Sequence, residues 1–121
     1  MESLYNLLEI GLTEGEAKVY LALSKLGSST VGPVVKESGV AYSNIYDILN
    51  RLIEKGIVSF IVKSKTRYFQ ACSPSNLLDY LDKKEKKMHE EKENLKKILP
   101  ELEKDTSRSR EAAGIKRGAG S

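Results

Sequence analysis

Three basic side chains, Lys63, Lys65 and Arg67, alternate along a short segment in the middle of the chain. In a strand, alternation places side chains on one side, so we expect the three to share one face of a hairpin. Each could neutralise one phosphate of a polyanion and displace its counterions. A second interpretation is that these charges protect an exposed strand edge from pairing with another chain.

Polar side chains also gather on the free face of a helix predicted just before this segment. They are Tyr42, Ser43, Asn44, Tyr46 and Asn50. Asn can form a two-point contact with an adenine edge, and Ser and Tyr can reach bases or phosphates. The start of a helix also favours phosphate. The competing interpretation is an ordinary solvated helix surface, but the basic segment nearby favours binding to double-stranded DNA.

The distribution of charge supports a local anionic partner. The 121 residues carry a net charge of +3. Residues 1–50 have a balance of −3 and residues 75–106 a balance of −1, whereas residues 51–74 have +4 and residues 107–121 have +3. Positive charge is therefore concentrated in one central segment and in the tail, which favours one anionic site over a general polycation.

Few other residues indicate chemistry, and we expect no enzyme, no metal site and no cofactor. The chain has one cysteine, Cys72, and one histidine, His89, which exclude a disulfide framework and leave no metal-ligand spacing. No nucleophile–base set or phosphate loop is present. No apolar run reaches the length of a membrane span, and the N-terminus lacks the features of a signal peptide. We therefore expect a cytoplasmic, nucleoid-associated protein.

The elements that position these residues follow from apolar spacing and from helix caps. The pattern predicts four helices and then a hairpin with a basic tip. Their ranges are 4–10, 13–26, 31–38, 41–55, and 57–62 paired with 67–72. This is the plan of a winged helix-turn-helix, mainly α with a small β-hairpin. The aromatic residues expected in its core are Tyr20, Phe60, Tyr68 and Phe69.

A long helix is predicted over residues 75–105, after a DNA-binding domain at 1–74. Its apolar residues repeat every seven positions, at Leu81, Met88, Leu95 and Leu102. This heptad spacing is typical of a coiled-coil seam, and we expect it to form a homodimer. The alternative is that the stripe packs against its own domain. Pro100 predicts a kink or an end of the helix near Leu99, and residues 106–121 are predicted to form a flexible basic tail.

Four stretches together resemble the TrmB-type archaeal transcriptional regulators, over about residues 4–80. They are Leu12–Tyr20, Ser38–Leu49, Leu52–Val58, and Arg67–Phe69 with Ser73-Pro74 after it. The resemblance implies a winged-helix DNA-binding domain, a dimer and a regulator of transcription. Larger members continue into a sugar-binding effector domain, which this chain does not reach, so no sugar ligand is implied and any effector stays open.

Three functions are consistent with the sequence. The one we expect is a sequence-specific, dimeric transcriptional regulator, which would show a strong salt dependence and a defined site. The same fold could instead serve as a non-specific architectural protein of the chromosome. It could also be a protein-interaction module, since fold alone does not settle function.

Overall fold

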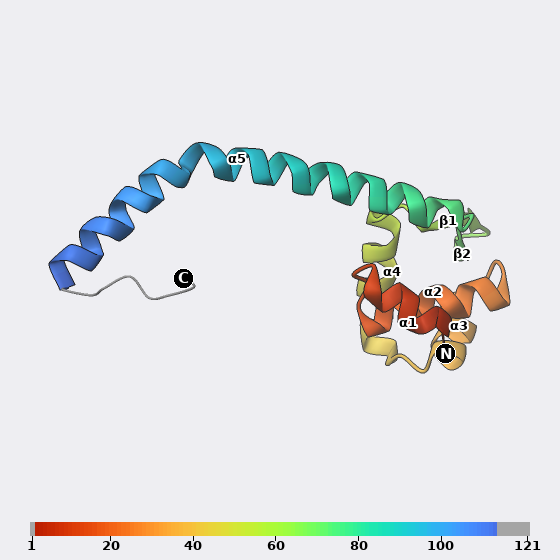
Figure 1. Cartoon of the computed structure of the whole chain (residues 1–121). Helices are drawn as coiled ribbons and strands as arrows, with labels where there is room; N and C mark the ends of the chain where they lie inside the picture. The colour runs from red at the N-terminus through yellow and green to blue at the C-terminus, as the bar shows by residue number, and fades with distance from the viewer. Residues whose placement is uncertain (1, 114–121) are drawn as a thin grey trace. The chain divides into compact units, whose positions relative to one another are not determined.

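A computed structural model of the chain describes residues 2–113, with side chains up to residue 107. It confirms a fold that is mainly α-helical with one hairpin (Figure 1). The elements are α1 (Glu2–Glu9), α2 (Glu14–Leu26), α3 (Val31–Ser38), α4 (Tyr42–Glu54), β1 (Val58–Lys63), β2 (Thr66–Ala71) and α5 (Ser75–Ala113). The winged helix-turn-helix plan is therefore present, followed by a long helix.

The start of α2 is fixed by the predicted capping box. The Glu16 amide donates to the Thr13 hydroxyl over 3.1 Å, and the Thr13 amide donates to the Glu16 carboxylate over 2.8 Å. These two bonds satisfy amides that have no acceptor within the helix. At the other end of the helix pair, Gly39 follows α3 with a φ of 73°. This left-handed conformation suits glycine and lets the chain turn from α3 into α4.

One face of α4 anchors it in the domain. Ile45, Ile48, Leu49 and Leu52 are spaced three and four residues apart, and all four are buried. They join one core cluster with residues from α1, α2, α3 and both strands. Phe69 extends this core into the hairpin and is 1 % exposed. The opposite face of α4 is thereby left free, and its orientation is set by the core.

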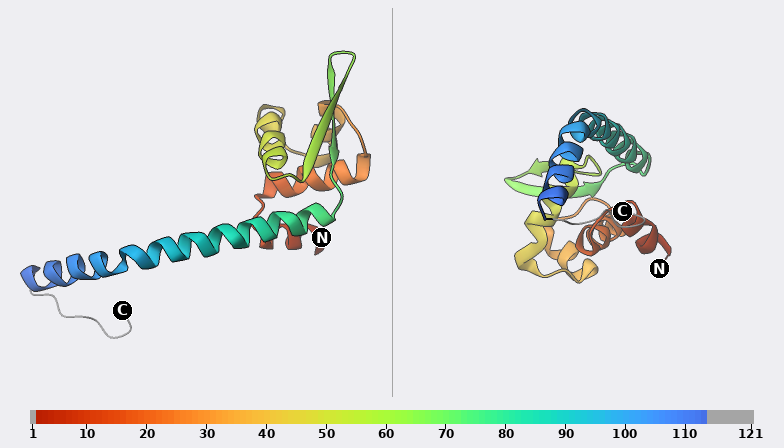
Figure 2. Two further views of the ribbon diagram at one scale, coloured as in Figure 1. Left: turned by 90° about the horizontal axis from the view of Figure 1, so that it is seen from above. Right: turned by 60° about the vertical axis from the view of Figure 1, so that its left-hand side comes forward.

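The hairpin stands beside α4, and its tip reaches out past the helices (Figure 2). Its strands pair antiparallel, with Val62 opposite Arg67 and Lys63 opposite Thr66. A turn of two residues joins them, Ser64 at a φ of 49° and Lys65 at 66°. Both strands are thus one residue longer at the tip than the sequence predicted.

Residue contacts divide the chain into two compact units, one ending at Asp82 and one beginning at Lys83. The helix α5 continues through Pro100 to Ala113. Of the two outcomes predicted near Leu99, a kink or an end of the helix, the end is therefore wrong. A proline lacks an amide proton and leaves the carbonyl of Lys96 without its helical donor. In Figure 1 the blue part of α5 turns away from the direction of the cyan part, as such a break permits.

The predicted basic tail begins inside this helix. Residues 106–113 are helical, although the sequence predicted a flexible segment from residue 106. Residues 114–121 lie outside the described part of the chain, and so do the side chains of Arg108 and Arg110.

Candidate nucleic-acid interface

The predicted recognition helix α4 presents its polar side chains on two separate flanks. Successive residues of a helix are rotated by about 100°. Tyr42 and Tyr46, four positions apart, therefore form one flank, and Asn44 lies almost on the opposite side of the exposed arc. Ser43 and Asn50 lie between them. All five predicted residues are exposed, but they do not converge on one point.

The tyrosine flank is ordered by a contact between its own rings. Tyr42 and Tyr46 are packed edge to face, with ring centroids 6.2 Å apart and planes at 88°. A hydrogen bond with Tyr42 raises the pKa of the Tyr46 hydroxyl above its usual value, while the positive charge of Arg67 on the hairpin opposes the rise. The charge of the hairpin therefore contributes to the electrostatic environment of this flank of α4.

The wing does not carry its three cations on one side, and that prediction is wrong. Residues directly opposite in an antiparallel pair share a face. Arg67 lies on the same face as Val62, and Lys63 lies on the same face as Thr66. Lys63 and Arg67 therefore point to opposite sides of the hairpin. Lys65 belongs to the turn. Alternation along the sequence failed because the three residues belong to two strands and a turn.

Each of the two strand cations lies over an aromatic ring of its own face. The guanidinium of Arg67 is 4.9 Å from the centroid of Phe60, and the ammonium of Lys63 is 5.9 Å from that of Tyr68. Such contacts hold a cation in place without neutralising it. Phe60 is 38 % exposed, so the prediction that it is a core residue is wrong. It serves as a platform for Arg67 on the side that faces α4.

An ionic cluster that sequence reasoning missed joins α2 to the end of α4. The carboxylate of Glu16 is completely buried and accepts bonds from the Lys55 ammonium over 2.7 and 2.8 Å. Burial acts to raise the pKa of Glu16, but the bonds from Lys55 and Thr13 outweigh it and lower the pKa below 4.5. The sequence identified Glu16 as part of a cap, but gave no signal for a partner 39 positions later.

The four apolar residues predicted to form a dimer seam all lie on α5. Leu81 is half-buried, whereas Met88, Leu95 and Leu102 are 64 %, 49 % and 46 % exposed. Within the described residues no other element covers the last three, which belong to the second unit. An exposed apolar stripe of this kind is available to another chain.

No group of acidic residues, His or Cys that could hold a metal ion occurs among the described residues. No helix in the described part of the chain is both long and apolar enough to cross a membrane.

Comparison with known proteins identifies the family. The family model described as the sugar-specific transcriptional regulator TrmB matches residues 7–75. The chain belongs to the TrmB family. The match runs from the end of α1 through α2, α3, α4 and the hairpin to the first residue of α5, and so includes both α4 and the wing.

One curated protein resembles the chain in sequence, and one solved structure resembles it in fold. The HTH-type sugar sensing transcriptional regulator TrmBL1 of Pyrococcus furiosus is 38 % identical over 101 residues, which are 84 % of this chain and 28 % of TrmBL1. The solved structure of TrmBL2, an archaeal chromatin protein with a novel mode of DNA binding, matches with a TM-score of 0.76 and 28 % identity. That match covers 98 % of this chain and 47 % of TrmBL2. The chain thus spans less than half the length of either.

A third match concerns the fold alone. The structure of NadR in complex with 4-hydroxyphenylacetate has a TM-score of 0.51 at 17 % identity and covers 84 % of both chains.

Proposed function

We propose that this TrmB-family chain binds double-stranded DNA sequence-specifically as a homodimer and regulates transcription. The observation that carries the proposal is the exposed polar face of α4 beside the wing (Figure 2), with Tyr42 and Tyr46 packed together on the helix and Arg67 over Phe60 on the hairpin. In the winged-helix plan the first turns of the recognition helix enter the major groove. Ser43 and Tyr46 occupy those turns, and Asn50 follows one turn later.

The wing adds two kinds of contact in this proposal. Arg67 is held by Phe60 on the side toward α4, and we assign it to the groove edge next to the recognition helix. Lys63 and Lys65, on the far face and at the turn, would bind flanking phosphates. Phosphate contacts position a protein but carry no sequence information, so the cations of the wing have different roles.

The homodimer rests on the stripe of α5. Leu81, Met88, Leu95 and Leu102 repeat every seven residues, and the last three are large apolar side chains that are exposed. Two DNA-binding units joined in this way would bind half-sites related by symmetry, about one helical turn apart. The protein would act at the chromosome, and the proposal requires no cofactor and no catalysed reaction.

The second candidate is an architectural, chromatin-type protein, favoured by the match to TrmBL2, itself described as a chromatin protein. Such a protein would bind duplexes of any sequence through phosphates. The ratio of specific to non-specific affinity separates the two candidates.

The deciding experiment is a selection from random duplex DNA with the purified protein at about 150 mM salt, the range at which non-specific binding is weak. A palindromic motif would establish the specific dimer, and light scattering would report its mass. Binding without an enriched motif would support the architectural protein. Absence of DNA binding would overturn both and leave a protein-interaction module.

Two variants distinguish a base contact from a phosphate contact in this experiment. Asn50→Ala is expected to change the selected motif, because a base contact is lost, at a cost of about 1–3 kcal/mol. Lys63→Ala should lower the affinity for all sequences alike. If Lys63→Ala changed the motif and Asn50→Ala did not, the assignment of readout to α4 would be wrong.

A further inference from the structure

Two cations, Lys55 and Arg51, approach the single buried carboxylate of Glu16. This carboxylate already receives two short bonds from Lys55. A second cation, Arg51 of α4, approaches the same carboxylate, with its Nε 3.4 Å from Oε2. Glu16 and Lys55 already form a neutral pair, so Arg51 is a second cation on one carboxylate.

The environment of the two cations differs. The side chain of Lys55 is 25 % exposed and that of Arg51 is 51 % exposed, so the second cation lies at the surface. Asp47 stands one turn earlier on the same flank of α4, but no ion pair joins it to Arg51 in the described structure. Arg51 instead reaches across to α2, which fixes the direction of its side chain.

A guanidinium has five N–H donors in a rigid fork. The nitrogen of Arg51 nearest to Glu16 is Nε, so the terminal nitrogens are available to an acceptor. Arg51 lines an open cavity between the start of α2 and α4, together with Asn44 and Asp47. A flat, directed cation at such an edge suits an oxygen anion with two acceptors, such as a phosphate.

The position along α4 distinguishes a phosphate from a base. In the winged-helix plan the N-terminal residues of the recognition helix contact base edges. Arg51 lies in the last turn of α4, which ends at Glu54, and it is on the flank away from the tyrosines. A residue there would meet the DNA backbone at the rim of the groove.

We propose that Arg51 is a further DNA-binding residue, which contacts a backbone phosphate, and that Glu16 is the residue that positions it. The proposal rests on the proposed DNA-binding function and adds a third anchor to the wing and the first turns of α4. The anchor joins DNA to α2 through a buried carboxylate, so the angle of α4 in the groove is held from its C-terminal end.

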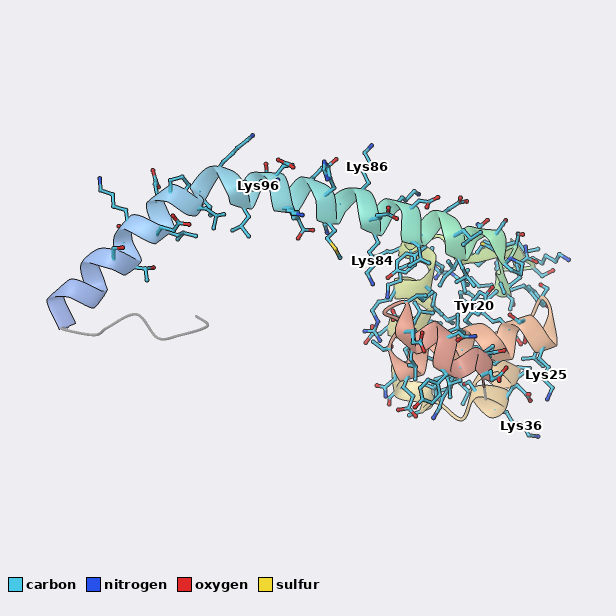
Figure 3. The ribbon with its side chains drawn as sticks, viewed as in Figure 1. Tyr20, Lys25, Lys36, Lys84, Lys86 and Lys96 are labelled. Carbon is cyan, nitrogen blue, oxygen red and sulfur yellow. The ribbon has the colours of Figure 1, made fainter. Side chains whose placement is uncertain are left out.

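The test compares the salt dependence of DNA binding for the wild type, Arg51→Gln and Lys25→Gln on one random-sequence duplex. Lys25 is the matched control, since it is exposed and paired with Glu37 at the far end of α2 from α4 (Figure 3). Loss of one phosphate contact lowers the slope of log K against log salt by about 0.9. We expect this change for Arg51→Gln and no change for Lys25→Gln.

An unchanged slope and affinity for Arg51→Gln would overturn the phosphate contact, even though the wild type binds DNA. A wild type that binds no DNA would instead overturn the proposed function, and the contact with it. The two failures are therefore distinguished by the wild-type measurement alone.

Arg51→Lys tests the positioning role of Glu16. Lysine keeps the charge, but it cannot hold Glu16 through one nitrogen and a phosphate through others. We expect Arg51→Lys to bind DNA less tightly than the wild type. In a Glu16→Gln background, we expect proteins with Arg51 and with Arg51→Lys to bind equally tightly. A thermal melt confirms that the Glu16→Gln protein is folded. Equal binding by Arg51→Lys and the wild type would contradict positioning, and it decides the question even if Glu16→Gln does not fold.

Discussion

Residues 2–82 bury a continuous hydrophobic core, whereas every described side chain from residue 83 to residue 107 is exposed. The first region contains tertiary pairs such as Lys55 with Glu16 and Phe69 with Ser29. The second region contains exposed pairs within one helix, such as Lys96 with Glu93. Helices in water depend on tertiary packing for most of their stability, so the first region is a domain, and the proposed homodimer would supply packing for the second.

The largest expected effect comes from breaking the buried ion pair of the first region. Lys55→Ala leaves the carboxylate of Glu16 buried without its main partner, which costs about 3–5 kcal/mol of unfolding free energy. The matched change in the second region, Lys96→Ala, removes an exposed pair, and such pairs contribute almost nothing. Urea denaturation of both variants checks the contrast, and equal losses would mean that burial does not distinguish the two regions.

A smaller effect is expected from the seam of α5. Leu95→Lys places a charge on the exposed apolar stripe and forfeits about 1.5–3 kcal/mol of burial per chain in a homodimer. Because about 1.4 kcal/mol corresponds to a tenfold change in Kd, the dimer should dissociate at concentrations where the wild type stays paired. Sedimentation equilibrium measures this.

The control for the seam is Lys97→Ala, which lies on the opposite side of α5 from Met88. It should leave the dissociation constant unchanged. A wild type that is monomeric at all concentrations, or a Leu95→Lys variant that dimerises as well as the wild type, would contradict the idea that α5 needs a second copy.

The pH dependence of stability should also separate the two regions. The folded pKa of Glu16 is lowered below 4.5, so its contribution is fully present above pH 4.5 and is lost as the pH falls toward the lowered value. We expect the first region to lose stability below pH 4.5, with a flatter profile for Glu16→Gln. Thermal melts followed between pH 6 and the acid range check this, and identical profiles would exclude Glu16 as the titrating group.

The smallest expected effect concerns the turn of the wing. Ser64 and Lys65 both have positive φ, a conformation that hairpin turns of this kind usually assign to Asn and Gly. Lys65→Gly should relieve about 1 kcal/mol of strain and raise the thermal midpoint by a few degrees. Thr66→Gly, one position later and inside β2, should lower it, so equal shifts would show that the turn is not strained.

The candidate interface was partly predictable from the sequence. Apolar spacing identified the buried face of α4, and therefore also the polar face with Tyr42, Ser43, Asn44, Tyr46 and Asn50. It did not show that Asn44 and Tyr46 lie on different flanks, because both count as exposed. Nor did alternation reveal that Lys63 and Arg67 face opposite ways, since that depends on where one strand ends and the next begins.

By itself the sequence determined the number, type and order of the elements, the wing and the apolar repeat of α5. These features depend on local spacing, caps and turn residues, which act over a few positions. Only the tertiary structure brought Lys55 and Arg51 to Glu16, and only the register of the hairpin brought Arg67 over Phe60. Glu16 and its partners lie far apart in the chain, and they meet because the packing of the core fixes how α2 and α4 approach one another.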